Sequence, residues 1–357
     1  MAKRPTIVQV VESFGGGVFQ SVSQLCNGLQ DVADFVVVHD IRAETPQNFE
    51  SSFPAGTRFI QLEMGRAINP KKDPRRALNL RKVLIAQKPH AVHAHSSKAG
   101  ALTRIALLGT GIRRFYSPRG YGFLMKNSSP LKRAVYWLAE RGLGFLPATT
   151  VACGYGELTP ARWVSWRSVV IPNGISPDMV PVASRKRPAI KEDLQVVSSG
   201  RISPQKNFPL FCRVAEHFLG RPVAFTWVGG GDIPAELKIP ANVTVTGWLP
   251  HAESLRQLNK GHIYFHMSGW EGLSRIVLEA MAHGFPLILS DIPGNRELAS
   301  ASNGFLCKTE SEAIAALDSF LAEPGKITTM SQASLNHLNA NYNWNNSLKA
   351  WKKLYSI

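Results

Sequence analysis

The chain has 357 residues, more than a single hydrophobic core usually supports, so we expect two domains. Its composition, 44% hydrophobic and 18% charged, is that of a globular protein and excludes a disordered one. There is no run of 18 apolar residues, and the N-terminus turns acidic and glycine-rich too early for a signal peptide, so we expect a cytoplasmic protein. The four cysteines lie far apart and form no CxxC or Cys/His cluster, which argues against disulfides and zinc.

The net charge of +16 is concentrated in the first half of the chain. Up to Val170 there are 23 Lys and Arg residues against 10 Asp and Glu, whereas the remainder has 18 against 15. This asymmetry predicts an anionic partner, either nucleic acid or an acidic membrane surface. A merely solvated basic face is the alternative.

The first domain opens as a parallel α/β unit. A β-branched strand at Thr6–Val11 is followed by the turn Gly15-Gly16-Gly17 and by a helical pattern over about 18–29. Backbone amides at such a helix start can approach an anion closely. The three glycines do not match the GxGxxG fingerprint, and no suitably placed acid follows a second strand, so a conventional NAD site is not predicted.

Basic amphipathic helices follow in this domain. After strands at 35–39 and 57–61, a helix is predicted at 74–87, and another at Pro130–Leu143. A basic amphipathic helix fits attachment to an anionic membrane surface, with a plain solvated face as the alternative. The cations of the first helix are Arg75, Arg76, Arg81 and Lys82, preceded by Lys71 and Lys72, and those of the second are Lys132, Arg133 and Arg141.

Polar residues follow two later strands of the first domain. The strand at 91–94 leads into His95 and Lys98, and the strand at 114–117 leads into a glycine-flanked loop with Arg119 and Tyr121. Open α/β sheets bind ligands at the C-terminal ends of their strands, so these four residues are candidates for an acceptor or anion site. His93 and His95 form an HxH pair, but no third metal ligand lies nearby. Isolated histidines are more often structural than functional.

The domain boundary is predicted from composition. Strands at 149–153 and 168–171 complete the first domain. The predicted linker is the polar, Pro- and Lys-rich run that follows the PNGI stretch at 172–175 and ends near Glu192. We assign 1–175 and the C-terminal helix (344–357) to the first domain, and 176–343 to the second. Leu348, Trp351 and Leu354 stand at helical spacing and are predicted to dock the last helix.

Two cations follow the first strand of the second domain. The strand from Leu194 ends at Gly200 and Arg201, and Lys206 stands at the start of the next helix. With the amides of that helix start, the two cations would enclose one anion-sized space. Two ordinary surface cations are the alternative.

Two carboxylates lie in the stretch GWEGLSRIVLEAMAHGFP at 269–286. Glu271 falls in a glycine-flanked turn, and Glu279 falls in a short helix at about 274–283 that is apolar nearly all round, so we expect that helix to be buried. Desolvating an ionised Glu without compensation costs several kcal/mol. Glu279 therefore needs either the hydroxyls of a ligand or an ion pair with Arg275, four residues before it.

GRISPQKN at 200–207, followed by Glu271 and Glu279 with seven residues between them, resembles the paired signature of the retaining GT-B glycosyltransferases of family 4. The resemblance covers most of the chain, from the glycine turn through the PNGI run at 172–175 to the last helix, and is strongest in the second domain. It implies an α/β fold of two Rossmann-like βαβ domains facing across a cleft, with the C-terminal helix crossing back to the first domain.

The resemblance also implies that 1–175, with the last helix, is the acceptor- or membrane-facing domain and that 176–343 is the donor-binding domain. It implies a role for each matched residue as well. Arg201 and Lys206 would bind the donor diphosphate and support the departing nucleotide, while Glu271 would hold the donor sugar and phosphate. Glu279 would bind the ribose hydroxyls. Arg119 stands where many relatives have a histidine that helps to hold the donor sugar, which leaves its role open between donor and acceptor. The other donor-binding positions would be Gly16, Gly17, Gly200, Gly272, Leu273 and Ser274.

Together with the basic first domain, the resemblance implies a cytoplasmic, peripherally membrane-associated hexosyltransferase. It would move a sugar with retention, without a metal or bound cofactor, from a UDP- or GDP-sugar to a hydroxyl of a lipid-linked or oligosaccharide acceptor in bacterial polysaccharide or O-antigen (lipopolysaccharide) assembly. The alternative is a GT-B-like epimerase or phosphorylase, although we find no persuasive acid/base pair for an epimerase. A nucleic-acid-binding protein is less favoured, because the basic residues are not interleaved with aromatics and no nucleic-acid motif is present.

Overall fold

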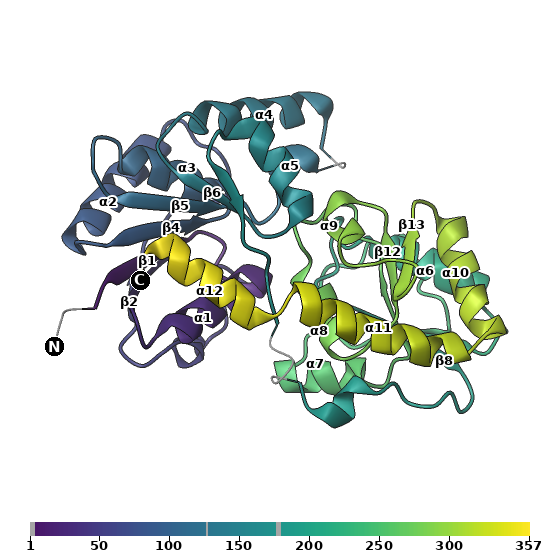
Figure 1. Cartoon of the computed structure of the whole chain (residues 1–357). Helices are drawn as coiled ribbons and strands as arrows, with labels where there is room; N and C mark the ends of the chain where they lie inside the picture. Colours follow the sequence, from purple (N-terminus) through teal and green to yellow (C-terminus); the bar gives the residue numbers. More distant parts are fainter. Residues whose placement is uncertain (1–3, 126–127, 176–179) are drawn as a thin grey trace. The chain divides into compact units, whose positions relative to one another are not determined.

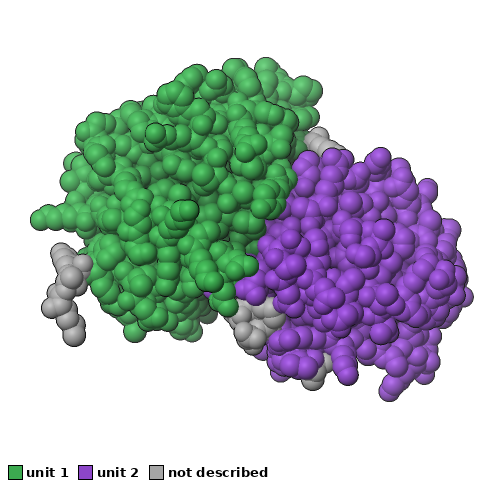
Figure 2. Space-filling model, in the orientation of Figure 1, with its two compact units in different colours: residues 1–173, 345–357 green, residues 174–344 purple. Residues whose placement is uncertain are grey.

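The computed structural model describes residues 4–125, 128–175 and 180–357 of two compact units (Figures 1 and 2). Unit 1 comprises Met1–Asn173 together with Asn345–Ile357, and unit 2 comprises Gly174–Trp344. Each unit is built on its own parallel sheet, flanked by helices. The predicted pair of Rossmann-like α/β domains is confirmed, and the cleft between them stays a prediction.

The sheet of unit 1 has seven parallel strands in the order β3-β2-β1-β4-β5-β6-β7. Its central strands are nearly continuous apolar runs, as expected for a parallel sheet that is covered on both faces. The strands are β1 (Thr6–Val11), β2 (Asp34–His39), β3 (Arg58–Gln61), β4 (Ala91–His95), β5 (Arg113–Ser117), β6 (Thr149–Ala152) and β7 (Ser168–Val170).

Helices alternate with these strands, as in repeated βαβ units. They are α1 (Gly16–Leu29), α2 (Asp73–Ala86), α3 (Ser97–Ala106), α4 (Pro130–Leu143) and α5 (Tyr155–Val164), with short 3₁₀ turns η1 (Phe49–Ser52) and η2 (Gly122–Leu124). Helix α4 begins where it is predicted to begin, because Ser129 caps its start by accepting a hydrogen bond from the Lys132 amide and Pro130 supplies a preset first turn.

The sheet of unit 2 has six parallel strands in the order β10-β9-β8-β11-β12-β13. The strands are β8 (Leu194–Ser199), β9 (Val223–Val228), β10 (Val243–Val245), β11 (Ile263–His266), β12 (Leu287–Ser290) and β13 (Gly304–Cys307). Strand β13 is not among the predicted strands, because its sequence GFLC begins with glycine and has no β-branched residue. The other elements are η4 (Val182–Arg185), α6 (Phe208–His217), α7 (His251–Leu258), α8 (Arg275–Ala282), α9 (Pro293–Arg296), α10 (Glu310–Ala322) and α11 (Gly325–Asn341).

The last helix, α12 (Trp344–Tyr355), packs against the sheet of unit 1. Trp351 and Tyr355 are buried there, and the Tyr355 hydroxyl lies 2.6 Å from His93 Nδ1. Arg113 from β5 donates to the carbonyls of Leu354 and Tyr355 at 2.7 Å each, and so caps the helix end. Tyr355, rather than the half-buried Leu354, is therefore the second anchor beside Trp351.

Part of the predicted linker is anchored on unit 2. Arg187 donates to the His283 carbonyl at 2.6 Å and lies over the Phe285 ring at 3.8 Å. Burial lowers the pKa of Arg187 to about 10. Residues 176–179 of the predicted linker lie outside the described residues. The described part of the linker near Arg187 thus packs against the segment that follows the C-terminal end of α8.

Both sheets reverse their strand order between two central strands. The reversal falls between β1 and β4 in unit 1 and between β8 and β11 in unit 2. In open α/β sheets, ligands bind beyond the carboxyl ends of the strands at this switch point. The segments that follow these four strands are therefore the first places to look for a site.

Candidate active site

Closely packed glycines shape the turn after β8. Gly200 has φ +128° and Gly229, after β9, has φ +138°, a region that favours glycine. A Cβ on Gly229 would lie 2.3 Å from the Gly200 carbonyl oxygen, so no side chain fits there. The indole of Trp227 donates to the same oxygen at 2.9 Å. The backbone leading into Arg201 is therefore rigidly held, and Arg201 itself is exposed.

A buried ion pair joins the segments after β8 and β11. Lys206 Nζ lies 2.7 Å from Glu271 Oε1, and the two side chains are 13% and 10% exposed. His266, the last residue of β11, places its Nε2 at 3.2 Å from the same carboxylate oxygen and at 3.5 Å from Lys206 Nζ. The Ser274 hydroxyl lies 3.4 Å from His266 Nε2. Lys206 and Glu271, which the sequence singles out separately, thus meet at the switch point of the second sheet.

The pair keeps the Glu271 carboxylate ionised. Burial alone would raise the pKa of Glu271, but the charge of Lys206 and the hydrogen bond to His266 outweigh it and lower that pKa to about 2. Burial and the Lys206 charge lower the pKa of His266, so its imidazole is neutral at pH 7. Glu271 is consequently a weak base that positions Lys206 rather than a group that takes up a proton.

His266 and Gly294 contact the Glu271 turn and are not among the predicted site residues. A Cβ on Gly294, in α9, would lie 2.4 Å from the Gly272 carbonyl oxygen and 2.6 Å from that of Glu271. The turn that carries Glu271 therefore rests directly on the backbone of α9. The signals that could have found them are a polar residue ending the apolar strand IYFH and the Pro-Gly-Asn turn that follows β12.

Glu279 is less buried than predicted, with 26% of its side chain exposed. It pairs with Arg275 at 3.2 Å, which is the alternative left open by the sequence. Ile276 on the same side of α8 is also only partly buried, so this face of the helix is partly open although its sequence is apolar nearly all round. The binding of ribose by Glu279 stays a prediction. The matched positions Gly272, Leu273 and Ser274, ahead of α8, are buried.

In unit 1, the glycine turn after β1 is open on one side. Gly16 and Gly17 are exposed, and a Cβ on either would meet nothing within 4 Å. Gly15 is different, because its Cβ would lie 2.5 Å from Glu44 Cγ. Glu12, at the start of this turn, is buried and accepts hydrogen bonds from Arg42 at 2.7 Å and Ser96 at 2.8 Å.

His95 and Arg119 meet at the strand ends of unit 1. Arg119, held at φ +60°, places one guanidinium nitrogen 3.3 Å from His95 Nδ1 and donates from the other to Asn173 Oδ1 at 2.8 Å. His95 Nε2 lies 2.8 Å from Gln9 Oε1. Burial and the nearby His93 and Arg119 lower the pKa of His95 well below its ordinary value, so it is neutral at pH 7. These residues form a hydrogen-bonded group with one cation.

Lys98 and Tyr121 do not have the surroundings of anion-binding side chains. Lys98 is buried and forms an ion pair with Asp73 of α2, and it also donates to the Ala67 carbonyl at 2.8 Å. Tyr121 is 1% exposed and stacks on Phe123 with ring centroids 4.8 Å apart. Their place after strands is as predicted, but tertiary contacts turn both inward.

Helix α2 has a weaker basic face than predicted. Arg76 pairs with Glu63 and Asp73, and Arg81 donates to the carbonyls of Ala106 and Leu108. Two of the four helix cations are thus committed to contacts within unit 1. No helix among the described residues has the length and apolar character needed to cross a membrane. Within the same ranges, no group of three or more His, Cys, Asp or Glu residues is arranged to hold a metal ion.

Comparison with known families agrees with this geometry. The model of the glycosyl transferases group 1 matches residues 182–354, and that of a glycosyl transferase 4-like domain matches residues 16–174. The chain belongs to the group 1, family 4-like glycosyltransferases. The boundary between the two matches falls between β7 and β8, and the group 1 match contains the Lys206–Glu271 pair.

Individual relatives point the same way. The Escherichia coli UDP-Gal:alpha-D-GlcNAc-diphosphoundecaprenol alpha-1,3-galactosyltransferase is 26% identical, over 76% of this glycosyltransferase and 74% of the relative. Among solved structures, the Thermosynechococcus elongatus sucrose-phosphate synthase has a TM-score of 0.82 at 19% identity and covers 99% of this chain and 98% of its own. Anabaena HepE in complex with UDP and glucose has a TM-score of 0.78 at 15% identity, covering 99% and 100%. These two structures establish the GT-B fold.

Proposed function

We propose that this glycosyltransferase moves a hexose from a UDP-sugar to a hydroxyl of a polyprenyl-diphosphate-linked acceptor in polysaccharide assembly, with retention at the sugar carbon. The observation that carries the proposal is the Lys206–Glu271 pair, 2.7 Å apart at the switch point of the second sheet. The Escherichia coli relative uses UDP-Gal and a diphosphoundecaprenol-linked GlcNAc, and HepE is described with UDP. These relatives support the choice of donor nucleotide and acceptor class.

The charge arrangement suits a departing diphosphate. Breaking the bond between sugar and phosphate places new negative charge on the leaving oxygen, and a preorganised cation in a site of low dielectric stabilises that charge. A lysine ammonium has three donor hydrogens, so Lys206 can hold Glu271 and still donate to a phosphate oxygen. Arg201 would contact the second phosphate. Glu279 would accept hydrogen bonds from the ribose hydroxyls in exchange for Arg275.

Retention and metal independence are part of the proposal. Glu271 is tied to Lys206 and has a pKa of about 2, which makes it a poor nucleophile and a poor base. In a front-side transfer, the departing phosphate oxygen takes the proton of the acceptor hydroxyl. Such a transfer needs neither a nucleophile nor a base from the protein. Lys206, Arg201 and the amides ahead of α8 would supply the positive charge that a metal supplies in other transferases.

A transfer assay with UDP-galactose and a lipid-diphosphate-linked GlcNAc tests the proposal. Lys206→Ala should lower kcat by about 10²- to 10³-fold, as expected for removal of one charge-stabilising donor. Glu279→Ala should mainly raise KM for the donor, by about tenfold. Arg213→Ala, which removes an exposed pair with Glu310 in the same unit, is the matched control. Unchanged turnover in Lys206→Ala, Arg201→Ala and Glu279→Ala together would refute the site, and absence of transfer from any nucleotide sugar would refute the function.

A further inference from the structure

Helix α4 exposes an apolar face to solvent. Leu131, Val135 and Leu138 are 76%, 48% and 62% exposed. They are spaced four and three residues apart, so they form one stripe along the helix. We call these three residues the α4 stripe. A helix on the surface of a soluble domain normally turns its apolar stripe toward the core, and the α4 stripe faces the opposite way.

The inward face of α4 carries a buried charge as well as Tyr136 and Trp137, which pack against the core. Glu140 is 5% exposed and pairs with Arg104 at 2.9 Å, and it also accepts a hydrogen bond from the Tyr116 hydroxyl at 2.7 Å. This fully partnered carboxylate fixes the orientation of α4 on unit 1. The outward stripe is therefore a fixed property of the folded helix.

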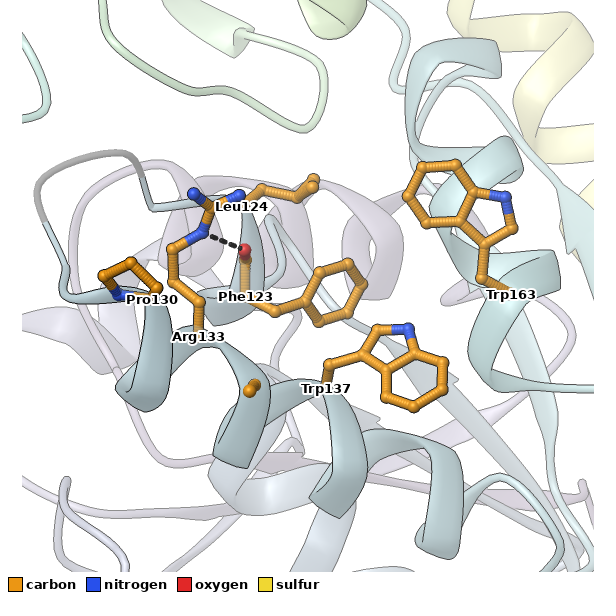
Figure 3. Close-up of a pocket in the computed structure, with 7 residues that line it drawn as sticks. Phe123, Leu124, Pro130, Arg133, Trp137 and Trp163 are labelled. Carbon is orange, nitrogen blue, oxygen red and sulfur yellow. Dashed lines mark hydrogen bonds between the residues drawn. The ribbon is translucent and has the colours of Figure 1, made fainter.

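Aromatic side chains extend the apolar surface beyond the helix. Trp137 of α4 and Trp163 of α5 line a hollow of about 340 Å³ together with Phe123 and Leu124 (Figure 3). Trp163 is 55% exposed, and Phe145 just after α4 is 57% exposed with Arg141 over its ring at 4.3 Å. Tryptophans with an apolar body and a polar N–H are typical of surfaces at a membrane interface.

The exposed charge around this surface has one sign. From Ser128 to Val170 the chain contains two acidic residues, Glu140 and Glu157, and both are buried. Glu157 is 2% exposed and accepts hydrogen bonds from the Gly120 and Cys153 amides. The basic residues of the same segment are Lys132, Arg133, Arg141, Arg162 and Arg167. The exposed charges of the segment that contains α4 and α5 are therefore all positive.

We propose that the α4 stripe, together with Trp163 across the neighbouring hollow, is the surface by which unit 1 inserts shallowly into an anionic lipid bilayer. An outward apolar stripe, interfacial tryptophan and surrounding cations match the two components of such binding, burial of apolar area and attraction to acidic headgroups. The inference rests on the proposed function, because a polyprenyl-linked acceptor lies in a membrane. It assigns the contact to α4 and α5 rather than to the basic helix α2, half of whose cations are committed internally.

Co-sedimentation with phosphatidylcholine vesicles containing about 30% phosphatidylglycerol tests this surface, with neither donor nor acceptor present. Leu131→Glu combined with Leu138→Glu should lower the partition coefficient by at least about tenfold. Leu78→Glu, on an exposed leucine of α2 that is 60% exposed, is the matched control and should leave binding unchanged. Wild-type protein should bind the anionic vesicles more strongly than pure phosphatidylcholine, and part of that binding should persist at about 1 M salt, where charge attraction is screened.

Three results would overturn the proposal. They are equal vesicle binding by the double variant and wild type, a loss of binding in Leu78→Glu instead, or a dimer in light scattering that the double variant abolishes without any vesicle binding by wild type. UDP binding separates this proposal from the proposed function. A double variant that binds UDP normally but does not bind vesicles supports both the membrane surface and the proposed function. Failure of the wild-type protein to bind UDP would contradict the proposed donor site but not the membrane surface.

Discussion

The two switch points share one topology and differ in electrostatics. In unit 2, a lysine and a glutamate meet as ions, with a neutral His266 beside them. In unit 1, His95 stays neutral next to Arg119, and the neighbouring His93 contacts Tyr355 of the returning helix. The same strand order therefore supports a charged site in one unit and a hydrogen-bonding site in the other, set by which side chains follow the strands.

Under the proposed function, this difference would divide the labour of a transferase. A nucleotide diphosphate needs positive charge that is already in place, and Lys206 of unit 2 would provide it. In unit 1, His93 and His95 are fully buried and would position the partly exposed Arg119, which would face the acceptor. The following predictions test whether the two regions differ in this way.

The largest effect is expected from breaking the ion pair on one side. Glu271→Gln should destabilise unit 2 by about 3 to 5 kcal/mol, because it leaves the Lys206 ammonium, 13% exposed, without its counter-charge. Urea unfolding measures the change. Adding Lys206→Met to this variant should restore most of the stability but none of the turnover. If the double variant is as unstable as the single one, the carboxylate stabilises the fold by some route other than the pair.

The free energy of unfolding should depend on pH in two separate ranges, one set by Glu271 of unit 2 and one by His93 and His95 of unit 1. The folded-state pKa of Glu271, about 2, lies below its ordinary value of 4.5, so its contribution of about 3 kcal/mol is complete above pH 4.5 and is lost as the pH falls toward 2. His93 and His95 have folded-state pKa values well below 6.5, so the unfolded chain takes up protons first and stability starts to fall below pH 6.5. Unfolding free energies measured across pH should lose the acid window in Glu271→Gln and part of the slope below pH 6.5 in His95→Gln. An unchanged profile in both variants would contradict the assignment.

Much of the fold follows from local patterns in the sequence. The bounds of β1 and α4 are predicted to the residue, because a continuous apolar run and a Ser–Pro helix start are local signals. The contact between Lys206 and Glu271 has no such signal, since it depends on β8 and β11 lying side by side. Lys98 shows the converse, because its position after β4 is typical of a ligand site but Asp73 of α2 neutralises it. Strand ends can be predicted from sequence, whereas partners from distant elements cannot.

A smaller effect is expected in the anchor of α12. Tyr355→Phe removes the hydroxyl that lies 2.6 Å from His93 Nδ1 and leaves a buried imidazole nitrogen without that partner. It should cost about 1 to 3 kcal/mol in unit 1, with no change in UDP affinity. Thermal unfolding and UDP titration of the same sample check both parts. A loss of UDP binding in this variant would show that the two units do not divide their roles as proposed.

The smallest effect is expected from exposed ion pairs. Arg221 and Asp318, 40% and 43% exposed, form a surface pair in unit 2. Arg221→Ala should change the unfolding free energy by less than about 1 kcal/mol and leave turnover unchanged, because solvent screens the pair. Urea unfolding gives the comparison with Glu271→Gln. A cost equal to that of the buried pair would mean that burial does not distinguish the two.

The central claim is that the Lys206–Glu271 pair belongs to the site for the donor diphosphate, and calorimetric titration of UDP tests it most directly. UDP should bind wild type and Arg213→Ala with equal affinity and should bind Lys206→Ala about 10- to 100-fold more weakly, the expected loss for one charge-assisted contact. Equal UDP affinity in wild type and in a folded Lys206→Ala variant would contradict the claim.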